Sequence, residues 1–507
     1  MKPNVLFIVL PYVVHDIDST RPKIRSYHAF PYGLLSIATY CKDLMNIRII
    51  DCDTDPKYKD TIQQVLENDH IDIVGISMMF DISYIYLEEL LSLIKNSDPT
   101  ILTVLGGAAA SYSPEEILKE QDDLDALCYA EGEIPFRRLL ESWKQSKGIG
   151  FLDNYPSWIT RTTFNKKQRP VASFIQNLDD VINIDYSFID TSKYETREAF
   201  SPFSSYDRKH KQFFISTSRG CPFNCTFCSN SKIHGKKMRF AGVDVIIDHI
   251  RKLVSRYEMD VLTIYDDQLL IDMPRAKELF RRLAEFNLRI ECPNGLSVRY
   301  IDSEMAKLMK LAGMDTIYLA IESGSEYVLK KLIHKPLELS MVAPAVKALR
   351  KYDIFIHAFL VMGMPGEKSE HRKETSRFIK SIGIDWSGFQ MAMPFKGSRL
   401  YEICIKNGWI DKQSINSIDM RANGIFVKTI INIPGIDKEK VNQEVYEMNL
   451  DVNFHNNYRM KIGDYKTAAR CFEEVLRRYK EHKWAKHYLE ICEDKLSQLP
   501  TGYKPVA

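Results

Sequence analysis

Short apolar runs alternate with helical patterns along most of the chain, and this alternation limits the possible folds more than any other feature. Between residues 4 and 130 the apolar runs are VLFIVL, IRIID, IDIVGISM, TILTVLGG and DALCYA, and helical segments such as YLEELLSLIKN separate them. Strands separated by helices of this length pair in parallel, with helices on both faces of the sheet. We therefore expect an α/β protein whose residues 1–145 form a doubly wound, Rossmann-like domain.

The strand ends of this first domain carry residues that suit a ligand site. Doubly wound sheets bind ligands at the carboxyl ends of their strands. The residues expected at these ends are Ser77, Met78, Gly106, Gly107, Ser111, Glu131 and Gly132. The paired glycines would let the backbone approach a bulky ligand, although they would serve equally well to turn the chain.

The strand and helix alternation resumes after a mixed polar segment. We expect residues 146–206 to be a linker with little structure of its own, because proline and polar residues interrupt every periodic pattern there. From FFISTSRG to WSGFQMAMPF the chain then runs through about six strand and helix units, which suits a partial (β/α)6 TIM-like barrel over residues 207–400. In such a barrel the functional residues lie where the strands end.

The remaining residues, 401–507, are predicted to be helical. Gly463, Tyr465, Ala468, Phe472 and Ala485 fall roughly where a tetratricopeptide (TPR) unit places its packing residues. One such unit is not a stable array, so we expect it to pack against the preceding domain, with partner binding as the alternative.

The composition is that of an ordinary globular protein. Hydrophobic residues make up 45% of the chain and the net charge is +2, which gives no indication of nucleic-acid binding. No stretch approaches the roughly 18 consecutive apolar residues of a membrane span, and the N-terminal apolar run stops at Pro11 without a cleavage site. We expect a cytoplasmic protein whose cysteines stay reduced.

Three of the ten cysteines are crowded into the segment RGCPFNCTFCSN. Cys221, Cys225 and Cys228 have C-x3-C-x2-C spacing directly after a predicted strand. Thiolates at such short spacing wrap one soft metal centre, and both zinc and an iron–sulfur cluster fit this description. A structural zinc site would need a fourth ligand such as His234, because Cys292 lies far along the chain. A four-iron cluster held by three cysteines would instead keep one iron open for a ligand.

These residues resemble a known family. CPFNCTFC resembles the signature of radical S-adenosylmethionine (SAM) enzymes, and YDDQLLID, NGLSVRYID, AIESGSEYVLKKLIHKP and VMGMPGE resemble consecutive strand-end motifs of the same barrel. The segments PYGLLSIATYCKD, DIVGISMMF, VLGGAAASYSPEEIL and YAEGE are similar to the cobalamin (B12)-binding domain fused to such barrels. The whole chain therefore resembles a class B radical SAM methyltransferase.

The resemblance implies a 4Fe-4S cluster held by the three cysteines, with SAM bound at the open iron. The residues that it places around SAM are Phe227, Asp266, Asp267, Glu322, Ser323, Gly363 and Gly366. Each has a structural alternative, namely core packing, helix capping, an ion pair or a turn. The cobalamin contacts would be the strand-end residues of the first domain given above. His357, inside an apolar strand, is interpreted as a core histidine.

Two departures from related families refine this interpretation. The chain lacks the Asp-x-His-x-x-Gly motif of domains that ligate cobalt with histidine, since His15 and His28 have neither the spaced Asp nor the Gly. Cobalamin would therefore bind without histidine on cobalt; the alternative is that the domain binds no cofactor. Cys41, Cys52 and Cys128 are dispersed and are expected to be buried, which disfavours the second cluster of a methylthiotransferase.

The resemblance implies reductive cleavage of SAM to a 5'-deoxyadenosyl radical and methylation of an unactivated carbon, or phosphorus, of a small-molecule substrate. An external flavodoxin-like or ferredoxin-like protein would supply the electron. The alternatives are a radical cyclase or oxidoreductase of the anaerobic porphyrin cyclase type, a tRNA methylthiotransferase, and a metal-stabilised interaction protein without enzymatic activity.

Overall fold

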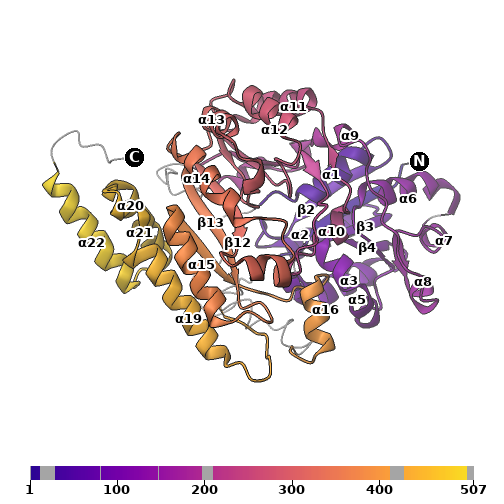
Figure 1. Cartoon of the computed structure of the whole chain (residues 1–507). Coiled ribbons are helices and arrows are strands. Elements are labelled where there is room, and N and C mark those ends of the chain that lie inside the picture. Colours follow the sequence, from indigo (N-terminus) through magenta and orange to yellow (C-terminus); the bar gives the residue numbers. More distant parts are fainter. Residues whose placement is uncertain are drawn as a thin grey trace.

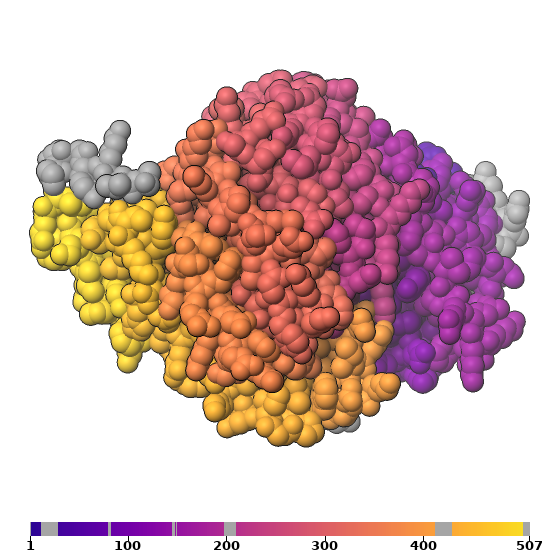
Figure 2. Space-filling view, viewed as in Figure 1, coloured from indigo at the N-terminus to yellow at the C-terminus, as the bar shows by residue number. Residues whose placement is uncertain are grey.

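The computed structural model describes residues 2–11, 29–79, 81–146, 148–196, 209–410 and 428–499. The chain folds into an N-terminal α/β domain, a central barrel and a C-terminal group of helices, coloured indigo to violet, pink to orange and yellow in Figure 1. The space-filling view shows the barrel between the other two parts (Figure 2). His15 and His28 lie outside the described residues.

The N-terminal domain contains the predicted doubly wound sheet, with strand order β2-β1-β3-β4-β5-β6. The first five strands are parallel and β6 is antiparallel. The strands are β1 (Asn4–Val9), β2 (Asn46–Asp51), β3 (Ile73–Ser77), β4 (Leu102–Gly106), β5 (Ala126–Cys128) and β6 (Trp158–Thr160). The helices that follow them are α1 (Tyr32–Cys41), α2 (Tyr58–Asn68), α3 (Leu87–Ser97), α4 (Ala108–Tyr112), α5 (Pro114–Glu120) and α6 (Glu133–Ser146).

Alternate residues of the central strand β1 face the two helical layers. Phe7 and Val9 belong to the cluster that contains Leu34 of α1 and Leu139 of α6. The intervening Leu6 and Ile8 pack in a second cluster with residues of α2 and α3. Because both faces are buried, the strand is a continuous apolar run, as parallel strands usually are.

The segment expected to be a linker has more structure than predicted. Its residues Trp158–Thr160 form β6, which pairs with β5 and closes that edge of the sheet. Short helices follow it along the chain, including α8 (Arg161–Asn165) and α9 (Asp179–Ile182). A three-residue strand is too short to give a period-2 pattern, so sequence periodicity could not reveal it.

The barrel has six parallel strands, each followed by a helix. The strands are β7 (Gln212–Ile215), β10 (Val261–Ile264), β11 (Arg289–Glu291), β12 (Thr316–Glu322), β13 (Phe355–Met362) and β14 (Trp386–Met391). The helices are α11 (Val243–Tyr257), α12 (Met273–Leu283), α13 (Ser303–Leu311), α14 (Val342–Arg350), α15 (Ser369–Ile382) and α16 (Arg399–Lys406). Hydrogen bonds join β7, β10 and β11 in one sheet and β12, β13 and β14 in another. A parallel bridge between Leu296 and Leu319 links the two sheets.

The C-terminal helices pack against the last barrel strand. They are α19 (Lys438–Leu450), a π-helix η7 (Asp451–His455), α20 (Tyr458–Lys461), α21 (Tyr465–Arg478) and α22 (Lys483–Gln498). Arg459 Nε donates to buried Asp385 at 2.6 Å, and Ser387 N donates to Asn453 at 2.8 Å. The helical character is confirmed, and assignment of α21 and α22 to a TPR-like unit remains a prediction. None of the helices that the structure describes is long and apolar enough to cross a membrane.

Candidate active site at the barrel mouth

The three clustered cysteines lie on one loop at the mouth of the barrel. This cysteine loop, residues 220–230, connects strand β8 (Ser218–Arg219) to helix α10 (Ser231–His234), and β8 pairs with β9 (Arg239–Phe240). Gly220 begins it with a φ of +96°, and a Cβ there would lie 2.3 Å from the Lys237 carbonyl oxygen. Only glycine accommodates both constraints, which explains why the loop opens with Arg-Gly-Cys.

The middle of the cysteine loop is anchored to the segment after β12. Thr226 N donates to the Ile333 carbonyl at 2.8 Å, and its hydroxyl donates to the Leu332 carbonyl at 2.7 Å. Cys225 and Phe227 pack against an apolar cluster that includes Val328 and Met364. Phe227 is half-buried, so part of its ring remains accessible, as a contact with adenine would require.

The thiols of the loop are free and accessible. Cys221 and Cys225 are half-buried, and Cys228 is exposed. Burial raises the pKa of Cys225 to about 12 and that of Cys228 to about 11, and it also raises the pKa of Cys221. The positive charge of Lys335 opposes this effect at Cys225. A bound metal would deprotonate such thiols, because coordination stabilises the thiolate.

A buried ion pair lies beside these thiols. Lys335 Nζ donates to Glu322 Oε1 at 3.0 Å, and both side chains are at least 84% buried. Burial lowers the pKa of Lys335, but the Glu322 carboxylate and the neighbouring Cys225 and Cys221 together outweigh burial, so the pKa is raised overall. Glu322 has a φ of +67°, which is unusual for a residue with a side chain and is typical of functional positions.

Among the other residues expected around SAM, two already use their polar groups within the protein. Asp266 is buried and accepts hydrogen bonds from Thr217 N and the Ser218 hydroxyl. The Ser323 hydroxyl pairs with that of Thr375 at 3.1 Å. These two residues therefore hold the backbone near the site. Asp267 instead faces the cysteine loop, where Asn230 donates to it at 2.6 Å.

The loop after β13 contains the remaining expected SAM residues. Gly363 and Gly366 have φ values of +76° and +91°. Gly363 N donates to the buried carboxylate of Glu367. Burial raises the pKa of Glu367 to about 7, against the opposing effects of this hydrogen bond and of Arg372. The loop is thus a pair of turns supported by a buried carboxyl group.

The residues expected to contact cobalamin gather at one edge of the N-terminal sheet. Ser77 and Gly106 end neighbouring strands and are register partners. Gly107 has a φ of +105°, and a Cβ there would lie 2.4 Å from the Met78 carbonyl oxygen. Gly106 has room beside it, since the nearest atom to its ideal Cβ is 3.9 Å away. The backbone at Gly106 therefore leaves space at this edge, where sheets of this kind bind their ligands.

Ser111, Glu131 and Gly132 lie near this edge but have structural contacts of their own. Ala130 N donates to the Ser111 hydroxyl at 3.0 Å. A Cβ at Gly132 would lie 2.6 Å from Ile37, so helix packing accounts for this glycine. The Glu131 carboxylate faces the barrel and pairs with Arg239, at 2.6 Å from Nη2. Ser111 and Glu131 could therefore contact a ligand only through atoms that are not used in these hydrogen bonds and ion pairs.

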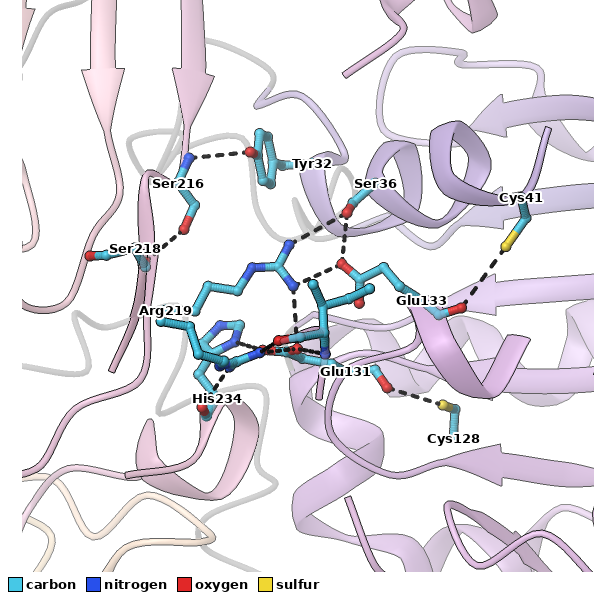
Figure 3. Close-up of polar contacts among 12 residues, drawn as sticks. Tyr32, Ser36, Cys41, Cys128, Glu131, Glu133, Ser216, Ser218, Arg219 and His234 are labelled. Carbon is cyan, nitrogen blue, oxygen red and sulfur yellow. Dashed lines mark hydrogen bonds and ion pairs between the residues drawn. The ribbon is translucent and has the colours of Figure 1, made fainter. Parts of the chain in front are cut away.

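A buried ionic network joins the two domains next to the cysteine loop (Figure 3). Arg219 reaches from β8 to Glu133 at 2.8 Å and to the Ser36 hydroxyl at 3.4 Å. His234 Nδ1 lies 2.9 Å from Glu131 Oε1, so its ring faces the N-terminal domain. A structural zinc site would need a fourth ligand such as His234, whose ring nitrogen instead pairs with Glu131. Among the described residues, no three His, Cys, Asp or Glu side chains group to hold a single metal ion.

Sequence reasoning did not single out several residues of this site. Lys335 stands in the quoted segment AIESGSEYVLKKLIHKP, and Arg219 stands two residues before Cys221, so both had a local signal. Tyr112, whose hydroxyl donates to the Ser229 carbonyl at 3.3 Å, had none. His357, interpreted as a core histidine, is half-buried beside Tyr318, and burial lowers its pKa to about 4.

Two family models match the chain, one in each α/β domain. Residues 215–379 match the radical SAM superfamily, and residues 25–140 match the B12 binding domain. The second match includes the strand ends at Ser77, Gly106 and Glu131, and the first includes the cysteine loop.

Related proteins match both domains together. The chain is 30% identical to cytidylyl-2-hydroxyethylphosphonate methyltransferase of Streptomyces wedmorensis, over 78% of this chain and 77% of that protein. It is 25% identical to the anaerobic magnesium-protoporphyrin IX monomethyl ester cyclase of Cereibacter sphaeroides, over 74% and 59%. Its fold is similar to that of the methyltransferase TsrM of Kitasatospora setae, solved with cobalamin and a 4Fe-4S cluster, with a TM-score of 0.63 at 17% identity over 81% and 79%.

Proposed function

Because this chain belongs to the cobalamin-binding radical SAM enzymes, we propose that it uses a 4Fe-4S cluster, SAM and cobalamin to methylate an unactivated carbon or phosphorus atom of a small-molecule substrate. The observation that carries the proposal is the juxtaposition of two sites. The free thiols of the cysteine loop lie directly beside the strand-end loops of the N-terminal domain, to which Tyr112 and Glu131 connect them.

The residues divide the work of binding as follows. Cys221, Cys225 and Cys228 would hold the cluster, and the strand-end backbone near Gly106 and Gly107 would hold cobalamin. Glu322 and Lys335 offer one negative and one positive group beside the thiols, which suits the amino and carboxylate groups of SAM. When bound, these cofactors supply reductive cleavage of SAM and transfer of a methyl group.

The protein contributes orientation and exclusion of water. The half-buried Phe227 and the turns at Gly363 and Gly366 offer a flat contact for adenine next to the loop. The apolar cluster beneath Cys225 keeps that side of the site dry. An external one-electron donor of the flavodoxin or ferredoxin class would reduce the cluster, and we expect the reaction to take place in the cytoplasm.

The alternatives from the sequence receive less support. The cyclase relative has lower identity and a shorter shared length than the phosphonate methyltransferase relative. A methylthiotransferase would need a second set of accessible cysteines, whereas Cys41, Cys52 and Cys128 are at most 6% exposed. Membership of an enzyme family argues against a purely structural role for the metal centre.

Anaerobic reconstitution with iron, sulfide and hydroxocobalamin, followed by desalting and metal analysis, tests the proposal. We expect about four irons and one cobalt per chain, and 5'-deoxyadenosine after addition of SAM and a strong reductant. Cys225→Ala should lose the iron and keep the cobalt. Cys492→Ala is the matched control, because Cys492 is buried in the C-terminal helices and should leave both metals in place.

Three results would contradict the proposal. If the reconstituted protein binds no cobalt, it lacks the proposed methyl carrier. If Cys225→Ala and Cys492→Ala retain equal amounts of iron, Cys225 does not hold the cluster. If the protein binds both metals but does not cleave SAM, it does not catalyse the proposed reaction. If instead both metals bind and SAM is cleaved, methylated products should be sought among phosphonates and other small molecules with unactivated carbons.

A further inference from the structure

The base of the cysteine loop brings two arginines face to face. Arg219 of β8 and Arg239 of β9 are register partners in an antiparallel pair. Both guanidinium groups are buried, with side-chain exposures of 7% and 4%. Like charges placed opposite each other on paired strands destabilise the pairing, and burial strengthens the repulsion. The pairing of β8 with β9 therefore needs a negative charge close to the two guanidinium groups.

Two carboxylates of the N-terminal domain supply this negative charge: Glu133 lies 2.8 Å from Arg219 Nη1, and Glu131 reaches both arginines. Glu131 Oε2 lies 2.8 Å from Arg239 Nη1 and 3.5 Å from Arg219 Nη1. Its Oε1 lies 2.6 Å from Arg239 Nη2 and 2.9 Å from His234 Nδ1. Figure 3 shows Glu131 reaching toward Arg219 and His234, which flank the cysteine loop on its two sides. Glu131 is thus the carboxylate that links both arginines and His234 at the base of the loop.

Tyr112 reaches the other end of the loop. It ends helix α4, which begins one residue after Gly107, so it belongs to the same strand-end connection as the proposed cobalamin contacts. Its hydroxyl donates to the carbonyl of Ser229, the residue that follows Cys228. Tyr112 is mostly buried, and its ring also lies against Gly397, where an added Cβ would be 2.4 Å from the ring. Packing therefore fixes the direction in which the phenol points.

We propose that Glu131 and Tyr112 are positioning residues through which the cobalamin-binding domain sets the conformation of the cysteine loop. Tyr112 ends the helix that follows β4 and contacts Ser229, the neighbour of Cys228. Glu131 follows β5 and contacts Arg219, two residues before Cys221. Occupation of the N-terminal domain would then stabilise the cysteine loop, and occupation of the loop would stabilise the domain to the same extent. This inference rests on the proposed function for the identity of the two ligands, but the contacts themselves need neither ligand.

The first test uses the full chain without cofactors. Hydrogen–deuterium exchange is measured for backbone amides of residues 220–235 in the wild type, Glu131→Gln, Tyr112→Phe and Glu116→Gln. Glu116 forms an ion pair with Lys396 across the same domain interface and has no described polar contact with the cysteine loop, so Glu116→Gln is the matched control. We expect exchange in the loop to rise about tenfold or more in Glu131→Gln and a few-fold in Tyr112→Phe. Glu116→Gln should leave it unchanged.

The second test uses reconstituted protein. Added hydroxocobalamin should slow exchange of residues 220–235 in the wild type, and the effect should be reduced in Tyr112→Phe. The electron paramagnetic resonance spectrum and the midpoint potential of the reduced cluster should change in both loop variants and stay the same in Glu116→Gln. A role limited to domain stability would not move these cluster properties.

The outcomes separate this inference from the proposed function. A wild type that binds no iron or no cobalt overturns the proposed function, while the cofactor-free exchange experiment still decides the positioning role. Normal cofactors with loop exchange and cluster spectra alike in all three variants overturn the inference. If Glu131→Gln fails to fold, Tyr112→Phe alone decides, since it removes a single hydroxyl oxygen.

Discussion

The Lys335 ammonium group lies 3.0 Å from the Glu322 carboxylate, in a buried pair that adjoins the cysteine loop. The pair has no counterpart of similar burial on the neighbouring turn: Lys330 and Glu326 are 55% and 43% exposed. The two lysines therefore offer a matched comparison between a buried and an exposed ion pair within a few residues of each other.

Lys335→Met should destabilise the cofactor-free protein by about 3–5 kcal/mol, because it leaves the Glu322 carboxylate buried without a partner. Lys330→Met should cost at most about 0.5 kcal/mol. Urea unfolding measures both values. Reconstituted Lys335→Met should also bind SAM more weakly, whereas Lys330→Met should not. Equal losses of stability in the two variants would show that the Glu322–Lys335 pair has no special role.

Glu131 should make the protein sensitive to acid. Burial favours the protonated carboxyl, but the hydrogen bonds from Arg239 and His234 and the nearby positive charge of Arg219 together outweigh burial and lower the pKa of Glu131 to about 2. A carboxyl group with a depressed pKa stabilises the fold above its unfolded pKa of about 4.5, and this contribution disappears as pH falls toward 2. It amounts to about 3 kcal/mol at 1.36 kcal/mol per pKa unit.

The free energy of unfolding of wild type and Glu131→Gln, compared between pH 6 and pH 3, checks this effect. The difference between the two proteins should shrink as the pH is lowered. Glu116→Gln, which removes an ion pair with a more exposed carboxylate, should show a smaller pH-dependent difference. A constant difference for Glu131→Gln across this range would mean that Glu131 is not charged in the folded protein.

Glu367 should have the opposite pH dependence. Burial raises its pKa to about 7 despite the Gly363 amide and Arg372, and its Oε1 has no hydrogen-bond partner in the described structure. A carboxyl group with a raised pKa favours the fold below about pH 4.5, and the benefit is lost as pH rises through 7. The loss is about 3 kcal/mol. Glu367→Gln should abolish this loss of stability at high pH and so increase thermal stability at pH 8 relative to the wild type.

Glu370→Gln is the control for this prediction. It lies one turn further along, and its side chain is 66% exposed, so its substitution should change the melting temperature little at any pH. A Glu367→Gln protein that is less stable than the wild type at both pH 5 and pH 8 would indicate that the carboxylate is needed to hold the loop at Gly363.

The features that the sequence predicted correctly are those with a local pattern. The doubly wound sheet, the barrel of about six strand and helix units and the cysteine loop all follow from apolar periodicity and cysteine spacing, and the family resemblance is confirmed by both family models. β6 was not predicted because a strand of three residues is too short to show a period-2 pattern.

Contacts between distant segments escaped prediction for a different reason. Glu131 and Arg239 are 108 residues apart, and Tyr112 and Ser229 are 117 apart. Nothing in either local sequence shows that these side chains meet, because the relative placement of two domains depends on surfaces assembled from many segments. The carboxylate of Glu131 was accordingly expected beside cobalamin, whereas the fold directs it into the barrel. For Glu131, a contact with cobalamin therefore remains a prediction only for the backbone atoms.

The two glycines at positions 107 and 33 give a direct test of the cobalamin edge. Gly107 has a φ of +105°, and an added Cβ would lie 2.4 Å from the Met78 carbonyl oxygen. Gly33, in the first turn of α1, has no atom within 4 Å of its ideal Cβ. Gly107→Ala must therefore move the connection after β4, at a cost of about 1–3 kcal/mol for the strained backbone, whereas Gly33→Ala should stabilise the helix by about 0.4–1 kcal/mol.

The same displacement should weaken binding of hydroxocobalamin. Gly107 lies between Gly106, which ends β4, and the helix that carries Tyr112, so a shift there changes the proposed cofactor edge and the contact with the cysteine loop together. We expect Gly107→Ala to reduce cobalt uptake about tenfold, which corresponds to about 1.4 kcal/mol, while Gly33→Ala takes up cobalt as the wild type does. Titration followed by absorption spectroscopy measures both affinities. Unchanged affinity in a folded Gly107→Ala protein would place the cofactor away from the β4 connection.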